Sequence, residues 1–178
     1  RTGVDVGCGA GLLTEPLARL GAAMTGVDAA PENVGAARTH AAAGGVDVNY
    51  VAGGIEDLAG RTFDLVVSME VIEHVADPVA FVAGLAGALA EGGVMILSTP
   101  NRTPLSRLAM ITLGEGMGAI PKGTHDWRRF LNPEELEELL GEAGMRVIDR
   151  SGLSFSPARG FVTSSNEALN YLVTAVRA

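Results

Sequence analysis

Short apolar runs alternate with amphipathic segments along most of the chain. The apolar runs have the length and continuity of strands that are covered on both faces. They are Thr2–Val6, Ala23–Val27, Val46–Ala52, Phe63–Ser68 and Val94–Thr99. The segments with helical spacing or helix-start residues are Leu12–Leu20, Pro31–Ala43, Pro78–Leu89 and Pro133–Ala143. Strands that alternate with helices of about ten residues predict a parallel sheet.

Two further strands, Met145–Ser151 and Leu169–Val176, are predicted near the C-terminus. No clear helix separates them, so we expect them to form a closing hairpin at one edge of the sheet. The segment 102–129 mixes apolar and basic side chains and is expected to be an insertion. No linker or repeat divides the chain, and we expect residues 1–178 to form a single domain.

Composition and charge narrow the class of protein. The 178 residues, 47% hydrophobic and 19% charged, can bury a core. The net charge of -8 argues against a nucleic-acid partner, which requires a positive surface field. The single cysteine, Cys8, excludes an internal disulfide and suits a reducing cytosol. No signal peptide is visible and no apolar run reaches the roughly 18 residues of a membrane span, so we expect a cytoplasmic protein.

A glycine-rich loop follows the first predicted strand. The spacing Gly7-x-Gly9-x-Gly11 lets a ligand approach the backbone closely. A dinucleotide fingerprint requires G-x-G-x-x-G/A, and Leu12 stands where its last small residue belongs. The loop therefore suits a ligand without phosphate, such as S-adenosylmethionine (SAM). The carboxylate of Asp5, just before the loop, could accept a hydrogen bond from the amino group of SAM. The alternative is a purely structural turn.

Acidic residues follow the second and third predicted strands. Asp28 ends the second strand about 20 residues after Gly7, where a carboxylate can accept hydrogen bonds from both ribose hydroxyls. Alternatively, Asp28 caps the helix that begins at Pro31. After the third strand, Ile55 can pack on an adenine ring while Glu56 holds its amino group, or this turn is an ordinary solvated loop.

In their order along the chain, these features resemble the class I SAM-dependent methyltransferases. The shared pieces are D-x-G-x-G-x-G, an acid at the end of the second strand, and F-D-L-V-V-S-M-E, within roughly Val4 to Thr99. The resemblance implies a Rossmann-like α/β fold with SAM as cofactor. Its sheet would be seven-stranded and mostly parallel, with helices on both faces and a C-terminal antiparallel strand.

Titratable side chains follow the fourth predicted strand, at the edge where open α/β sheets bind ligands. If the chain turns helically there, Glu70, Glu73 and His74 lie on one face at positions i, i+3 and i+4. Such a set can bind a divalent cation, or one member can act as general base. The alternative is a capped turn with a surface histidine and solvated acids.

Longer segments are similar to one family, the O-methyltransferases of ubiquinone biosynthesis. They are E-V-I-E-H-V at 70–75, S-T-P-N-R at 98–102, P-K-G-T-H-D at 121–126, L-S-F-S-P at 153–157 and N-Y-L at 170–172. The K-G-T-H-D segment is the most specific, because many class I methyltransferases lack it. Two departures from the family are expected: its upstream helical segment with a basic cofactor contact is not recognised in this sequence, and Ala10 replaces a common glycine.

This resemblance implies methylation of phenolic hydroxyls on polyprenylated ring intermediates. The cofactor contacts that it implies are Gly7, Asp28 and Met69. It also implies that Glu70, Glu73 and His74 hold a divalent cation, with Mg²⁺ or Zn²⁺ as candidates, which would stabilise a phenolate. Without a metal, a base such as His74 would have to remove a proton from a phenol of pKa near 10.

The insertion 102–129 combines basic residues such as Arg107 and Lys122 with large apolar ones. That mixture suits an anionic membrane surface, so we expect peripheral contact with the inner membrane, where a polyprenylated substrate resides. The alternative is a cover for the active site. His125 is a further catalytic candidate beside Asp126, or both residues merely organise the loop. The family resemblance also suggests a complex of ubiquinone-biosynthesis enzymes as a partner.

Three other functions fit parts of the pattern. One is a class I methyltransferase that acts on another small molecule, and a second is a non-catalytic subunit that retains the fold. The third is a nicotinamide-dependent dehydrogenase, against which Leu12 and the loop spacing argue. A measurement of SAM binding distinguishes the dehydrogenase, which would not bind SAM, from the other candidates. An activity assay distinguishes the non-catalytic subunit, which would show no turnover.

Overall fold

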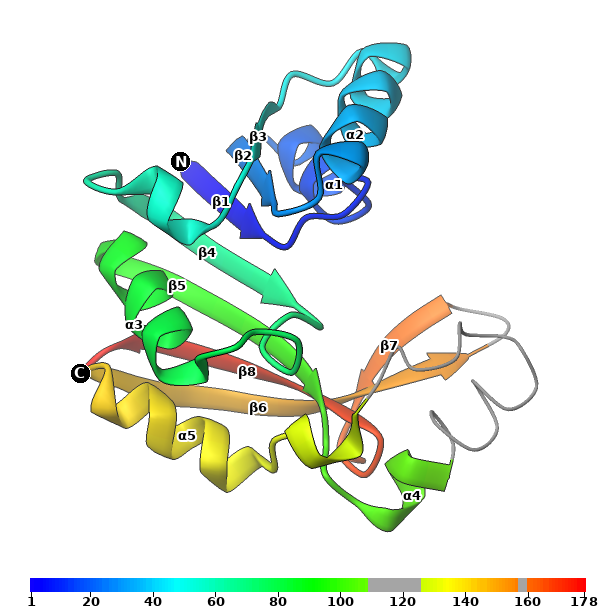
Figure 1. Ribbon diagram of the computed structural model, residues 1–178, viewed down its shortest axis with the longest axis vertical. Coiled ribbons are helices and arrows are strands. Elements are labelled where there is room, and N and C mark those ends of the chain that lie inside the picture. The colour runs from blue at the N-terminus through cyan, green and yellow to red at the C-terminus, as the bar shows by residue number, and fades with distance from the viewer. Residues whose placement is uncertain (109–125, 157–159) are drawn as a thin grey trace.

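The computed structural model describes residues 1–108, 126–156 and 160–178. Within them, eight strands form one sheet in the order β3-β2-β1-β4-β5-β8-β6-β7 (Figure 1). The strands are β1 (Thr2–Val6), β2 (Ala23–Asp28), β3 (Asn49–Ala52), β4 (Phe63–Met69), β5 (Leu89–Pro100), β6 (Met145–Ser156), β7 (Gly160–Ser164) and β8 (Asn170–Arg177). The α-helices are α1 (Thr14–Arg19), α2 (Pro31–Gly44), α3 (Pro78–Ala88), α4 (Pro104–Ser106) and α5 (Pro133–Glu142), and the 3-10 helices are η1 (Ile55–Leu58) and η3 (Trp127–Arg129).

The sheet is mostly parallel, as the sequence predicts, with antiparallel strands from the C-terminal part. Strands β1 to β5 run in one direction, and β8 is antiparallel to both β5 and β6. The predicted count of seven strands was wrong, because β7 adds an antiparallel edge strand beside β6. The two predicted late strands, β6 and β8, pair antiparallel as expected, but β7 and not this pair forms the edge of the sheet. The run that forms β7 is too short and too polar to be recognised from its pattern.

Helices cover both faces of the sheet, as expected when right-handed crossovers leave a central strand in opposite directions. Helices α1 and α2 lie on one side, and α3 and α5 lie together on the other (Figure 1). The larger core packs under α3 and α5 and includes Val66, Leu85 and Leu136, whereas a smaller cluster lies under α2. Among the described helices, none is long and apolar enough to cross a membrane.

The predicted start signals of the last two long helices are confirmed. The Asp77 side chain accepts a hydrogen bond from Ala80 N at 3.0 Å and caps α3. Helix α5 begins with a capping box, in which Asn132 Oδ1 accepts from Glu135 N and Glu135 Oε2 accepts from Asn132 N, both at 2.9 Å. These caps satisfy backbone N–H groups that have no partner within the helix.

Replacing the cap of α5 tests its contribution to stability. Asn132→Ala should lower the free energy of unfolding by about 1 kcal/mol, because Glu135 N loses its acceptor. Asn132→Ser keeps an acceptor and should lose only a fraction of that amount. Urea unfolding followed by circular dichroism measures both variants. Equal losses in the two variants would contradict a capping role.

Candidate functional site

A cavity of about 490 Å³ lies at the carboxyl ends of β1, β2 and β4. Most of the predicted site residues meet here, although they come from separate loops. Its lining includes Gly7, Gly9, Asp28, Ile55, Glu56, Met69, Glu70 and His74, together with Val6, Ala29, Asn33, Gly53, Gly54, Val71, Val75 and Phe81. We call it the edge cavity. Its position is where open α/β sheets bind ligands, since parallel strands end together at that edge.

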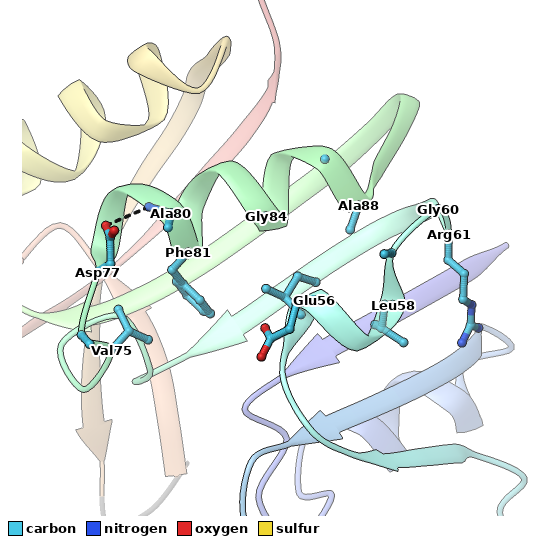
Figure 2. Close-up of a pocket in the computed structure, with 14 residues that line it drawn as sticks. Glu56, Leu58, Gly60, Arg61, Val75, Asp77, Ala80, Phe81, Gly84 and Ala88 are labelled. Carbon is cyan, nitrogen blue, oxygen red and sulfur yellow. Dashed lines mark hydrogen bonds between the residues drawn. The ribbon is translucent and has the colours of Figure 1, made fainter.

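A larger hollow of about 720 Å³ lies next to the edge cavity, between η1 and α3. Figure 2 shows Val75 and Phe81 at one end and Leu58 and Arg61 at the other. It is lined mainly by apolar and small residues and does not include the titratable turn after β4. Size alone therefore does not identify the site, since the predicted titratable residues Glu70 and His74 line the smaller cavity.

The three loop glycines adopt left-handed backbone conformations, with φ values of 80°, 54° and 85° at Gly7, Gly9 and Gly11. A Cβ at Gly7 would lie 2.2 Å from Val71 Cγ2, and one at Gly11 would lie 2.2 Å from the Tyr50 hydroxyl. A Cβ at Gly9 would meet no atom within 4 Å. Gly7 and Gly11 are therefore required by packing, whereas Gly9 leaves open space beside the loop. Gly11 does not line the edge cavity.

Asp28 ties the glycine loop to the start of α2. Its Oδ2 accepts from Gly9 N at 2.8 Å, and its Oδ1 accepts from Ala30 N at 2.9 Å and from Asn33 Nδ2 at 3.0 Å. These bonds fix the carboxylate at the cavity wall and leave acceptor capacity for a ligand. Asn33 was missed by sequence reasoning, although an asparagine in the first turn after an acidic strand end is a usable signal.

Asp5 lies beneath the loop rather than in the edge cavity, which differs from the predicted contact with an amino group. The residue is 2% exposed, and its Oδ2 accepts a hydrogen bond of 2.6 Å from Thr14 Oγ1. Burial raises the pKa of Asp5 to about 6, against the lowering effect of the Thr14 bond and with a smaller raising effect of Asp28. Asp5 thus joins β1 to α1 and supports the loop from below.

The turn after β4 is not a helix, so the condition under which Glu70, Glu73 and His74 would share one helical face is not met. Glu70 has a φ of 57°, in the left-handed region that a non-glycine residue seldom adopts. A tight turn follows, in which His74 N donates to Val71 O at 2.8 Å. The Glu70 carboxylate accepts from Ser98 Oγ at 2.6 Å and from Asn170 Nδ2 at 2.7 Å.

Glu73 lies behind His74. Its side chain is 1% exposed, whereas that of His74 is 46% exposed and lines the edge cavity. Glu73 Oε2 accepts from Thr99 Oγ1 at 3.0 Å, and Glu73 Oε1 lies 3.9 Å from His74 Nε2. That Oε1 atom is buried without a hydrogen-bond partner among the described residues. Burial, followed by the charge of Glu70, raises the pKa of Glu73 to about 7.

The raised pKa predicts that Glu73 costs stability as the pH rises. The folded state holds the Glu73 proton up to about pH 7, whereas the unfolded chain releases it near 4.5. Stability contributed by this group therefore falls between those values and is constant above them. Glu73→Gln should gain about 2 kcal/mol at neutral to alkaline pH and little near pH 5. Urea unfolding across this range measures the difference, and a gain independent of pH would contradict the assignment.

The geometry of the turn does not fit the predicted metal site. Glu70 and His74 line the edge cavity, but Glu73 is buried and does not line it, so the three side chains do not face one ligand together. In the part of the chain that the structure describes, no three His, Cys, Asp or Glu side chains converge as ligands. We therefore derive no step through a metal ion. His125 and Lys122 lie outside the described residues.

The described ends of the insertion are tied to the site. Asp126 caps η3 by accepting from Arg128 N at 3.0 Å, which fits the alternative that it organises its loop. Arg129 Nη1 donates to the His74 carbonyl at 3.3 Å, which joins η3 to the titratable turn. Trp127 Nε1 donates to Thr103 O at 3.0 Å and thereby joins η3 to the start of α4.

Known proteins resemble the chain over nearly its whole length. Residues 4–97 match the family model of a methyltransferase domain. The ubiquinone biosynthesis O-methyltransferases of Cereibacter sphaeroides and a Methylobacterium species are each 46% identical over 98% of this chain and 72% of their own lengths. The structure of magnesium protoporphyrin IX methyltransferase from Synechocystis with bound SAH is 26% identical, with a TM-score of 0.70 over 99% of this chain and 74% of that one.

The fold, the edge cavity and these similarities agree with one another. The match to methyltransferases over both the strands and the loops removes the dehydrogenase alternative. The fold is that of a SAM-binding methyltransferase. The chain belongs to the ubiquinone biosynthesis O-methyltransferases, a family of SAM-dependent enzymes with the class I α/β fold.

Proposed function

We propose that the chain transfers the methyl group of SAM to a phenolic hydroxyl of a polyprenylated ring in ubiquinone biosynthesis. The observation that carries this proposal is the lining of the edge cavity. It brings Asp28, which suits an adenosine ribose, into the same cavity as the titratable side chains of Glu70 and His74. Two relatives that are 46% identical to the chain are ubiquinone biosynthesis O-methyltransferases, which supports a phenolic ring of that pathway as the acceptor.

In the proposed complex, SAM lies along the edge cavity. Asp28 accepts the ribose hydroxyls, since its carboxylate is already oriented by Gly9 N and Asn33 Nδ2. Ile55 packs on the adenine and Glu56 accepts a hydrogen bond from its amino group, because both residues line the cavity together with Asp28. Gly7 and Met69 lie at the end of the cavity near the titratable turn, where the methionine part belongs.

Methyl transfer is an in-line displacement, so the enzyme must align oxygen, carbon and sulfur. We assign His74 as the general base that takes the phenol proton while the phenol oxygen attacks the methyl carbon. The bond between carbon and sulfur breaks, and its electron pair remains on the sulfur of the neutral product SAH. Glu73 stands 3.9 Å behind the imidazole, where a carboxylate stabilises the protonated ring.

We further propose that the two described ends of the insertion contact an anionic membrane. Leu105 and Leu108 are 49% and 51% exposed, and the guanidinium of Arg107 lies 5.6 Å from the centre of the Trp127 ring. Exposed apolar side chains beside cations suit the boundary between lipid headgroups and acyl chains. Partner enzymes of the same pathway would then meet the protein at the membrane surface.

The test of the acceptor uses deuterated-methyl SAM and three catechols, which carry a short prenyl tail, no tail, or a prenyl tail with both hydroxyls blocked. The proposal predicts a mass increase on one ring oxygen of the prenylated catechol, and none on the doubly blocked compound. A chelator arm tests whether an added metal ion matters. Transfer only to carbon, nitrogen or sulfur acceptors would contradict the proposal.

A further inference from the structure

We propose that Ser98 and Asn170 are positioning residues that hold the Glu70 carboxylate in place at the acceptor end of the edge cavity. The inference rests on the proposed function, since it assigns to Glu70 a role toward the acceptor. Its support comes from a different observation, which is the set of hydrogen bonds that converge on Glu70 from two other strands.

The backbone of Glu70 needs such support. A glutamate with a φ of 57° adopts a conformation that glycine or asparagine would adopt at lower cost. Conformations of this kind persist when the surrounding structure fixes them, and they gather at functional sites. Because glutamate is unfavourable at this position, we infer that its carboxylate has a function that glycine or asparagine could not supply.

Ser98 holds both ends of Glu70. Its hydroxyl oxygen accepts from Glu70 N at 3.2 Å, and the same hydroxyl donates to Glu70 Oε1 at 2.6 Å. The Ser98 carbonyl also accepts from Glu70 N, at 3.1 Å. One side chain thus fixes the peptide and the carboxylate of a single residue, which defines the rotamer as well as the turn.

Asn170 reaches the other carboxylate oxygen from a distant part of the sequence. Strand β8 is antiparallel to β5, with Asn170 paired to Pro100, so its first residue lies at the edge where β4 and β5 end (Figure 1). Asn170 Nδ2 donates to Glu70 Oε2 at 2.7 Å. The insertion of β8 between β5 and β6 therefore brings a donor to the site across 100 residues of sequence.

Stability alone does not explain an asparagine at this position. Its amide oxygen is buried without a hydrogen-bond partner among the described residues, and an unpaired buried acceptor is unfavourable. What the amide contributes is the bond to Glu70. A carboxylate requires donors on both oxygens to stay in one orientation, and Ser98 and Asn170 supply one each.

The experiment is a double-mutant cycle with three readouts: kcat and KM for the prenylated catechol, the Kd of SAH, and the melting temperature. Asn170→Ala and Ser98→Ala should each lower kcat roughly 10- to 100-fold, because each removes a bond to a charged group. The Kd of SAH should change less than about 3-fold. Ser98→Thr keeps the hydroxyl and should restore most of the activity.

The decisive comparison measures the effect of Asn170→Ala in a protein that already carries Glu70→Ala. If Asn170 acts through Glu70, then Asn170→Ala should cause no further loss of kcat in the Glu70→Ala variant. Losses that multiply in the double variant would overturn the inference. If Glu70→Ala itself keeps normal kcat, Glu70 has no role toward the acceptor and the inference is overturned, while methyl transfer to the phenol stands. If Glu70→Ala is slow while Asn170→Ala and Ser98→Ala are normal, only the positioning role fails.

Two matched controls separate positioning from general damage. Ser68 is buried in β4 and donates only to the Val6 carbonyl at 2.8 Å, so Ser68→Ala removes a similar hydroxyl without touching Glu70. Asn101 Nδ2 donates to the Glu167 carbonyl at 3.0 Å, which makes Asn101→Ala the control for the amide. Both should keep kcat within about 3-fold of the parent even where they lower the melting temperature. Equal loss of kcat in the controls would overturn the inference.

Discussion

Asp28→Ala is expected to weaken SAH binding roughly 100- to 1000-fold, because two hydrogen bonds from ribose hydroxyls to a carboxylate are lost together. The variant also removes the acceptor of the hydrogen bonds that Gly9 N and Asn33 Nδ2 donate to the Asp28 carboxylate. The glycine loop and α2 are then no longer joined through this side chain. Calorimetric titration of the full chain with SAH measures the change.

The control for this prediction is Asp64→Ala. Asp64 accepts from Thr2 N at 2.8 Å at the opposite end of the sheet, so its loss should leave the Kd of SAH within about 2-fold. A Kd for Asp28→Ala that stays within 5-fold or so of the parent would remove the ribose contact from the proposed complex.

His74→Ala is expected to lower kcat for the phenolic acceptor by roughly 100-fold or more, which is the usual contribution of a positioned general base. The Kd of SAH should change little, because the proposed complex assigns the adenosine part to Asp28, Ile55 and Glu56 and not to the imidazole. Rates in a single-turnover assay with saturating SAM report the chemical step directly.

His40→Ala is the matched control for this second prediction. His40 lies on α2, where its Nδ1 is 2.6 Å from Glu15 Oε1, and it does not line the edge cavity. Its replacement should leave kcat close to that of the parent even if the melting temperature falls. A single-turnover rate for His74→Ala close to the parent rate would transfer the role of base to another group.

Glu73 illustrates a conflict between stability and activity. Its buried carboxylate carries a raised pKa and an unpaired oxygen, so Glu73→Gln should stabilise the fold at neutral pH. The same change removes the negative charge behind His74. A variant that melts later but turns over more slowly would show that the charge is kept for catalysis.

The sequence predicted the central sheet well because each strand there is a continuous apolar run between clear turn residues. Strand β1 has the predicted bounds, and β2 ends at Asp28 as expected. The edges were harder. Strand β3 is shorter than its apolar run, and β6 extends to Ser156 because it pairs with β7, a contact that no local pattern encodes.

The residues of the candidate site that could be predicted from the sequence are those that end or directly follow a parallel strand. Gly7, Asp28 and Met69 end or follow parallel strands, and parallel strands end at one edge, so their convergence could be expected. The support around Glu70 could not be predicted, because Asn170 reaches it only through the placement of β8. The bond from Thr14 to Asp5 could not be predicted either, because it depends on how α1 packs against β1.

A crystal structure of the full chain with SAH tests the central claim most directly. The account predicts the ribose hydroxyls on the Asp28 carboxylate, the adenine between Ile55 and the residues after β2, and the sulfur facing the turn that carries Glu70 and His74. Density for SAH at any other place, with the cavity beside Asp28 closed by side chains, would contradict it.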